Sequence, residues 1–289
     1  MNTHARTQTP SPIILLTDFG TLDAYVGTMK GVILRTCWPD APPLIDLTHE
    51  VAPQDVRGAA FVLWTAYRYF PPQSVFIVVV DPGVGSARRG MAVETPLGRF
   101  VAPDNGVLSE VLAEVGSWRA VALDPAIVGL PGGLSKTFHG RDLFAPAAAR
   151  LACGASLDSL GPPLESPVRL EPPRLEIDQR TITGEIIHID HFGNAVTSIA
   201  LLTWRADGKL TLQPRYAAAD PFSFAPDAVT VQTAGQTFGR IAMTYSDVPP
   251  RAATPLIGSS GHLEIGVNQG GAASTLGLHR GDRITLTFT

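Results

Sequence analysis

The stretch 74–80, which reads SVFIVVV, is the feature of this sequence that most limits its possible folds. Nearly every residue in it is apolar, so neither face of a strand formed here suits contact with water. Strands buried on both faces are typical of parallel sheets covered by helices. The stretch therefore predicts a strand in the interior of an α/β domain.

The residues around this stretch alternate between strand-like and helix-like segments. Apolar residues recur at helical spacing in 55–69, which ends before Pro71, and 22–35 also reads as a helix. We further expect strands at 13–16 and 43–46, a hairpin at 91–94 and 99–102, and helices at 107–115 and 141–153. The alternation predicts a mainly parallel α/β domain over residues 13–170, preceded by a loose arm at 1–12.

The pattern changes after the proline-rich segment 161–174, which we interpret as a linker. Beyond it, short β-branched runs stand between turns, and helical spacing is nearly absent. The runs are 181–189, 195–200, 210–213, 228–233, 262–267 and 283–288. They predict a smaller all-β, barrel-like domain over residues 180–289.

The composition is that of a globular chain without a surface for nucleic acid or membrane. Of 289 residues, 45% are hydrophobic and 17% are charged, which argues against disorder. The 22 Lys and Arg residues are outnumbered by 26 Asp and Glu, with no basic stripe, so we expect no nucleic-acid partner. No apolar run approaches the ~20 residues of a bilayer span, and no signal-peptide stretch precedes the first expected strand.

The two cysteines, Cys37 and Cys153, lie far apart in helix-like apolar contexts. A disulfide framework or a zinc site would need more cysteines or closer ones. We therefore expect both to be buried small hydrophobes. This usage favours a reduced, cytoplasmic setting.

Two aspartates follow expected strands of the α/β domain, where such sheets place their ligands. Asp18 follows the first strand, and Asp81 follows the most apolar one and precedes a Gly-rich turn. A structural role is open for each, as a helix N-cap or Asx turn for Asp18 and as a turn-stabilising residue for Asp81. Neither Gly cluster matches a phosphate-binding loop.

Arg88 and His139 could join Asp81 in handling a water molecule. Arg88 lies across the Gly-rich turn from Asp81, and His139 stands in a Gly-rich loop before a helix. An arginine keeps a nearby aspartate ionised, and a carboxylate and an imidazole could hold one water and accept its proton. A structural or surface role for His139 is the open alternative. No metal-binding spacing is present, so we expect no metal.

The second domain contains three polar, Gly-rich segments. The segment 190–194 reads as a tight turn, and the amide of Asn194 suits the edge of a purine. Turn chemistry alone is the alternative explanation for Asn194. The segments 259–264 and 268–272 flank and overlap one expected strand.

Seven motifs, in order along the chain, resemble the S-adenosylmethionine hydroxide adenosyltransferase family, which is related to fluorinase and chlorinase. They are TDFG at 17–20, THEVAPQD at 48–55, VDPGVGS at 80–86 with Arg88, APDNG at 102–106, FHGRD at 138–142, DHFGN at 190–194 and GSSGHLEIGVNQG at 258–270. The resemblance implies an α/β domain followed by a β-barrel-like domain. It also implies an enzyme without a cofactor that cleaves S-adenosylmethionine to adenosine and methionine with water or hydroxide as nucleophile. Family members are trimers whose sites lie between the first domain of one subunit and the second domain of its neighbour.

The resemblance also implies roles for individual residues. Asp81, Arg88 and His139 match the family's water-handling set, and Asp18 matches its ribose-binding aspartate. The remaining substrate contacts that it implies are Gln54, Phe138, Asp190, Phe192, Asn194, Ser259, Val267 and Asn268.

Comparison with the halogenating relatives favours a hydrolase. In the alignment of motifs that the resemblance implies, Asp81 stands where fluorinase has a tyrosine. Gly140 stands where it has a halide-binding serine, and Ser260 where it has a methionine-binding arginine. This chain lacks those features and keeps the water-handling set. A chlorinase-like halogenase and a non-catalytic adenosine or S-adenosylmethionine binding protein are the alternatives, with a metallohydrolase as a weaker third.

Overall fold

The structure, a computed structural model, describes residues 10–289. Residues 1–9 of the expected N-terminal arm therefore lie outside the described residues. The chain forms two compact units, which we call the N-terminal unit, up to Leu170, and the C-terminal unit, from Glu171 to Thr289. Among residues 10–289, no helix is long and apolar enough to cross a membrane.

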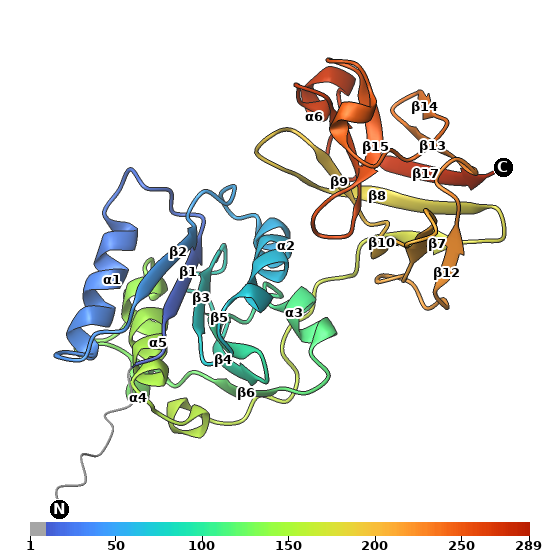
Figure 1. The fold of residues 1–289 in the computed structure, drawn as a ribbon. Coiled ribbons are helices and arrows are strands. Elements are labelled where there is room, and N and C mark those ends of the chain that lie inside the picture. The colour runs from blue at the N-terminus through green and yellow to red at the C-terminus, as the bar shows by residue number, and fades with distance from the viewer. Residues whose placement is uncertain (1–9) are drawn as a thin grey trace, which may run out of the picture. The chain divides into compact units, whose positions relative to one another are not determined.

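The N-terminal unit is built on a six-stranded sheet in the order β2-β1-β3-β5-β4-β6 (Figure 1). Its strands are β1 (Ile13–Thr17), β2 (Leu44–Thr48), β3 (Val75–Val79), β4 (Gly90–Thr95), β5 (Gly98–Pro103) and β6 (Arg119–Ala122). The first three pairs along this order are parallel, whereas β4 pairs antiparallel with both β5 and β6. The predicted mainly parallel α/β fold is confirmed, and so is the predicted hairpin.

Helices cover both faces of this sheet, as the apolar strand at 74–80 requires. Figure 1 shows α1 (Tyr25–Thr36) and α5 (Ala145–Ala152) on one face and α2 (Val56–Ala66) on the other. All five residues of β3 are buried. The shorter elements are η1 (Tyr67–Tyr69), α3 (Ser109–Glu114), α4 (Pro125–Val128), η2 (Gly140–Phe144) and η3 (Leu157–Leu160). The expected helix at 141–153 thus begins as a π-helical turn, η2, and continues as α5.

The expectation that both cysteines are buried, unpaired hydrophobes is wrong. Cys37 directly follows α1 and Cys153 directly follows α5, and the two form a disulfide with their Cα atoms 6.4 Å apart. Cys37 is buried, but Cys153 is exposed. The helices pack side by side in one core, so their ends meet although 116 residues separate the cysteines. The cysteines therefore give no support to a reduced setting.

The proline-rich segment 161–174 is held against both units. In the N-terminal unit, Val168 donates its backbone N–H to Asp104, and Leu170 donates to Ser109. In the C-terminal unit, the backbone N–H of Arg174 donates to Glu185. The segment runs from the N-terminal unit into the C-terminal unit, and each unit holds its own part of the segment by hydrogen bonds.

The C-terminal unit is an all-β fold with a separate apolar core. Its large sheet has the order β14-β13-β17-β8-β9-β16-β15, with β7 also paired to β8, and a second sheet has the order β10-β11-β12. The bounds are β7 (Leu175–Ile177), β8 (Thr181–Ile189), β9 (Ala195–Thr197), β10 (Leu202–Trp204), β11 (Leu210–Leu212), β12 (Phe222–Phe224), β13 (Val229–Thr233), β14 (Gln236–Phe238), β15 (Ala253–Ile257), β16 (Leu263–Val267) and β17 (Arg283–Phe288). The predicted barrel-like all-β architecture is confirmed. The short helix α6 (Ala272–Leu276) and the 3-10 turn η4 (Tyr245–Asp247) were not expected.

Candidate active site

The two aspartates singled out in the sequence lie at neighbouring strand ends. Strands β1 and β3 are parallel, with Thr17 opposite Val79, and Asp18 and Asp81 follow them at the same edge of the sheet. Both side chains line one cavity of about 590 Å³ within the N-terminal unit. The carboxyl ends of parallel strands thus place the two carboxylates in one ligand-sized site.

Asp81, Arg88 and His139 meet in the structure. Arg88 donates from Nε to Asp81 Oδ1 over 3.0 Å, and its Nη2 donates to Asp81 Oδ2 and to His139 Nδ1, the latter over 3.1 Å. The side chains of Asp81 and Arg88 are only 5% and 9% exposed. Asp81 and His139 line the cavity, whereas Arg88 lies behind them. The three side chains therefore form one buried, hydrogen-bonded set at the cavity wall.

The Gly-rich turn after β3 allows this convergence. Gly85 has a φ of +77°, and a Cβ atom there would lie 2.2 Å from the carbonyl oxygen of Lys136. Only glycine fits this close approach without strain. The turn that leads to Arg88 can therefore pack against the loop that leads to His139.

Burial and charge set the protonation states of this set. Burial raises the pKa of Asp81 above its ordinary value, and the contact with Arg88 opposes this rise. Burial and the positive charge of Arg88 lower the pKa of His139, so the imidazole is neutral near pH 7. Because arginine has only donors, Nδ1 of His139 accepts, and the ring proton stays on Nε2. The backbone carbonyl of Ser135 also accepts a hydrogen bond from this ring.

Asp18 is held by the second loop of the site rather than by the helix that follows it. Its Oδ2 accepts the backbone N–H of Gln54 over 2.7 Å. Helix α1 begins only at Tyr25, and the residue at its N-cap position is Ala24, so the N-cap role for Asp18 is wrong. The other carboxylate oxygen of Asp18 takes no hydrogen bond from the residues that the structure describes, and the side chain lines the cavity.

A buried histidine links the two loops that carry Asp18 and Gln54. His49 Nδ1 lies 2.9 Å from Thr17 Oγ1, and its Nε2 lies 3.0 Å from an oxygen of Asp46. The carbonyl of His49 also accepts the backbone N–H of Gly20. Through these contacts the motif at 48–55 holds the loop of the motif at 17–20 in place.

Three aromatic rings form an apolar wall of the same cavity. Phe19, Tyr25 and Phe138 contact one another with ring centroids 5.1–5.9 Å apart. Gly140 packs tightly below them, since a Cβ atom there would lie 3.1 Å from Met29 Sδ and 3.2 Å from Phe138. A serine at position 140 would therefore require these neighbours to move.

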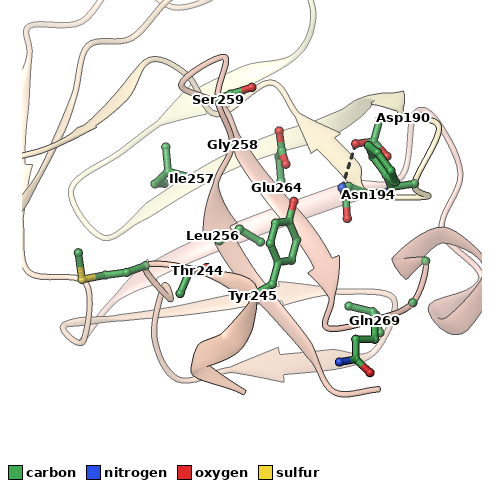
Figure 2. Close-up of a pocket in the computed structure, with 15 residues that line it drawn as sticks. Asp190, Asn194, Thr244, Tyr245, Leu256, Ile257, Gly258, Ser259, Glu264 and Gln269 are labelled. Carbon is green, nitrogen blue, oxygen red and sulfur yellow. Dashed lines mark hydrogen bonds between the residues drawn. The ribbon is translucent and has the colours of Figure 1, made fainter. Parts of the chain in front are cut away.

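The C-terminal unit has a cavity of its own, of about 980 Å³ (Figure 2). Of the residues that the sequence suggested, Asp190, Phe192, Asn194, Ser259 and Val267 line it. Asn268 does not line it, and its amide donates to the carbonyl of Val248 over 2.7 Å.

Asp190 and Asn194 are bonded to each other. The backbone N–H of Asn194 donates to Asp190 Oδ1 over 2.8 Å, and its side-chain amide donates to Oδ2 over 2.9 Å (Figure 2). The carboxylate oxygens of Asp190 and the side-chain NH2 group of Asn194 are therefore engaged within the turn. The amide oxygen of Asn194 takes no hydrogen bond within residues 10–289 and can accept one from a ligand.

Sequence reasoning did not single out Tyr245 and Glu264, which also line this cavity. Glu264 is only 8% exposed, and burial together with the nearby Asp190 raises its pKa to about 7. Burial raises the pKa of Tyr245 to about 12, with contributions from both carboxylates. Among the residues that the structure describes, no cluster of three or more His, Cys, Asp or Glu residues could hold a metal ion.

The α/β unit carries a buried set of a carboxylate, a guanidinium and an imidazole at a cavity wall, and the all-β unit has an acidic cavity. These features are typical of an enzyme that acts on a small substrate. The chain belongs to the SAM hydroxide adenosyltransferase family. Residues 13–161 match the N-terminal domain of that family, and residues 184–285 match its C-terminal domain.

Named relatives cover nearly the whole chain. A protein of Salinispora tropica named (R)-S-adenosyl-L-methionine hydrolase is 38% identical over 96% of this chain and 98% of its own length. A Thermus thermophilus protein of the same name is 36% identical over 95% of this chain and 99% of its own. The crystal structure of an uncharacterized conserved protein from Thermotoga maritima covers 95% of this chain and 99% of its own, at 37% identity and a TM-score of 0.80. A fluorinase of Actinopolyspora mzabensis is 30% identical over only 65% of the chain.

Proposed function

We propose that this protein hydrolyses S-adenosylmethionine to adenosine and methionine by in-line attack of water at the ribose 5′ carbon. The observation that carries the proposal is the set Asp81, Arg88 and His139 in the wall of the cavity that Asp18 also lines. The names of two relatives that cover nearly the whole chain support the substrate and the reaction.

In this reaction only the nucleophile needs help. The sulfonium leaves as the neutral thioether of methionine, so the C–S bond breaks with its electron pair on sulfur and no acid is required. The water oxygen forms the new C–O bond, and its proton goes to the Asp81 carboxylate. Arg88 keeps Asp81 ionised. Because Arg88 occupies the lone pair of His139 Nδ1, we assign His139 to positioning Arg88 rather than to taking the proton.

The remaining predicted residues bind the substrate. Asp18 accepts hydrogen bonds from the ribose hydroxyls, and the aromatic wall that includes Phe138 covers the sugar. The other proposed contacts are Gln54 in the N-terminal unit and Asp190, Phe192, Asn194, Ser259, Val267 and Asn268 in the C-terminal unit. Positioning of this kind can lower the barrier by ~7–11 kcal/mol.

The test of the activity is product identification by chromatography. Incubation of the protein with S-adenosylmethionine, without halide, should release adenosine and methionine in equal amounts. 5′-Chloro-5′-deoxyadenosine as the main product in chloride would make the protein a halogenase. Tight adenosine binding without turnover would make it a binding protein, and loss of activity with a chelator would indicate a metallohydrolase. Position 140 is a glycine, whereas the resemblance implies a halide-binding serine there in fluorinase, and this difference argues against the halogenase.

We further propose a cytoplasmic homotrimer in which the N-terminal unit of one subunit and the C-terminal unit of its neighbour form each site. The family resemblance supports this assembly, and the two sets of substrate contacts do belong to different units. Cell fractionation tests the cytoplasmic location.

Mixing two inactive variants should restore activity if sites are shared between subunits. Asp81→Asn damages only the N-terminal unit, and Asn194→Ala damages only the C-terminal unit. In randomly mixed trimers about one quarter of sites combine two intact units, so turnover should return to about one quarter of the wild-type value. The measurement is product formation after co-expression. Activity that stays at the level of the separate variants would show that each site lies within one chain.

Substitution of Gln54 distinguishes the role of its backbone, which binds Asp18, from the proposed role of its side chain in binding substrate. Gln54 has a φ of +67°, and its backbone N–H already binds Asp18. In Gln54→Gly this bond remains and the strained backbone is relieved, so we expect stability within about 1 kcal/mol of wild type. If the side chain contacts substrate, KM should rise about threefold to tenfold with kcat kept.

Gln54→Ala is the matched control, because it removes the same side chain but keeps the positive φ. Gln54→Ala should show the same KM as Gln54→Gly, but its melting temperature should be lower than that of Gln54→Gly. An unchanged KM in both variants would remove Gln54 from the proposed substrate contacts.

A further inference from the structure

Glu264 is the one acidic group of the C-terminal cavity that has no hydrogen-bond or ion-pair partner within residues 10–289. It lies on β16, opposite Leu256 of β15 and Val196 of β9, and is more than nine-tenths buried. Figure 2 shows its side chain in the cavity between Tyr245 and Ser259. Its carboxyl oxygens face the cavity and take no hydrogen bond from the residues that the structure describes, so a ligand in the cavity can supply the partner.

The backbone beside Glu264 leaves room for its carboxyl group. A Cβ atom on Gly258 would lie 1.7 Å from Glu264 Oε1 and 2.2 Å from its carboxyl carbon. On the same strand, a Cβ atom on Gly266 would lie 2.4 Å from the ring of Tyr245. Two glycines thus keep space for the two polar side chains that sequence reasoning missed.

The charges around the cavity select a cation. Asp190 and Glu264 both line it, and their mutual repulsion contributes to the raised pKa of Glu264. No Lys, Arg or His is among the described residues that line it. Asp190 already receives two hydrogen bonds from Asn194, whereas Glu264 receives none. A bound cation at Glu264 would therefore relieve an unfavourable charge that the protein leaves uncompensated.

We propose that Glu264 determines specificity for the amino-acid end of the substrate, by accepting a hydrogen bond and an ion pair from its α-ammonium group. This inference rests on the proposed function, since it names a contact to the same substrate. S-adenosylmethionine carries two cationic groups, the sulfonium and the ammonium, and adenosine carries none. The ammonium is the cation that has N–H donors for a carboxylate.

The test compares S-adenosylmethionine with its analogue that lacks only the α-amino group. In Glu264→Gln, the KM for S-adenosylmethionine should rise about tenfold or more, whereas the KM for the desamino analogue should stay at its wild-type value. Adenosine, tested as a competitive inhibitor, should inhibit both proteins equally. Glu176→Gln, on an exposed carboxylate of the same unit that pairs with Arg174, is the matched control and should change none of these values.

Each other outcome overturns the inference. Equal KM increases for both substrates would place Glu264 at the sulfonium, which both share. Weaker inhibition by adenosine would place it at the nucleoside. Equal KM values in wild type and Glu264→Gln would exclude a contact. Absence of turnover in wild type would instead refute the proposed function, so the two failures are distinguishable.

A second variant leaves Glu264 in place and moves its carboxyl group. Gly258→Ala introduces a methyl group where that carboxyl lies, so it must displace it. We expect the same selective rise in KM for S-adenosylmethionine. This variant keeps the inference testable if Glu264→Gln fails to fold, and an unchanged KM in folded Gly258→Ala would contradict it.

The pH dependence gives an independent measurement. The titratable groups facing Glu264 are Asp190 and Tyr245, and Tyr245 stays neutral near pH 7. An ammonium group binds the ionised carboxylate, so the ratio of the desamino KM to the S-adenosylmethionine KM should increase from about pH 6 to about pH 7.5. The ratio should be flat over this range in Glu264→Gln. A flat ratio in wild type would contradict the proposed contact.

Discussion

Asp81→Asn should lower kcat about a thousandfold while changing KM by less than about fivefold. Asparagine keeps the shape of the side chain but cannot accept a proton from the attacking water. In the proposed mechanism substrate binding depends on other residues, chiefly Asp18, which lines the same cavity, so the ground-state complex should still form. The measurement is steady-state kinetics with products followed by chromatography.

The control for this prediction is a second Asp–Arg pair of the same unit. Asp104 is buried and accepts hydrogen bonds from Arg89, but it does not line the cavity. Asp104→Asn should lower the melting temperature and leave kcat near the wild-type value. A kcat for Asp81→Asn within tenfold of wild type would show that another group takes the proton, and His139 would be the next candidate.

The Asp81–Arg88 contact could be predicted from local spacing, whereas the approach of His139 was expected only from the family resemblance. Arg88 follows Asp81 by seven residues across a Gly-rich turn, so local geometry alone brings the two side chains together. His139 is 51 residues from Arg88, and its approach depends on the close packing of Gly85 against Lys136. A tertiary contact of this kind leaves no periodic signal in the sequence.

The fold was predictable wherever one strong local pattern decided it. The apolar run at 74–80 and the runs at 181–189 and 283–288 became β3, β8 and β17 with nearly the expected bounds. The disulfide between Cys37 and Cys153 was missed, because only the packing of α1 against α5 brings the two helix ends together.

Glu264 was missed for a related reason. A half-buried strand alternates apolar and polar residues, but all five residues of β16 are buried, so no alternation marks Glu264 as facing a cavity. Asn268, a substrate contact that the family resemblance implies, does not line the cavity, and its side-chain amide donates to the carbonyl of Val248.

Glu264→Gln should make the free protein more stable above neutral pH, by up to about 3 kcal/mol at about pH 8. In the folded state the pKa of Glu264 is raised to about 7 from an ordinary value of 4.5. The folded protein thus holds this proton more tightly than the unfolded chain. The resulting stabilisation is complete below the unfolded pKa and is lost as the pH rises through about 7. Glutamine cannot ionise, so the variant avoids this loss.

The measurement is the difference in unfolding free energy between variant and wild type at two pH values. Titrating groups that do not interact with Glu264 act equally on both proteins and cancel in the difference. The advantage of the variant should be large at about pH 8 and small at about pH 4.5. Glu176→Gln should show no such advantage, because its carboxyl is exposed and Arg174 lowers its pKa. An equal difference at both pH values would mean that Glu264 does not titrate near neutrality.

Ligand binding should reduce this difference in stability. A ligand that binds only the folded state stabilises it by an amount that grows with the logarithm of its affinity, and the proposed ammonium contact would exist only in wild type. Saturating methionine, the product that carries the α-ammonium group, should therefore raise the melting temperature of wild type more than that of Glu264→Gln. A residue that destabilises the empty protein and stabilises the complex is retained for binding, as expected where stability and function compete. Equal shifts with methionine would leave the raised pKa in place but separate it from substrate recognition.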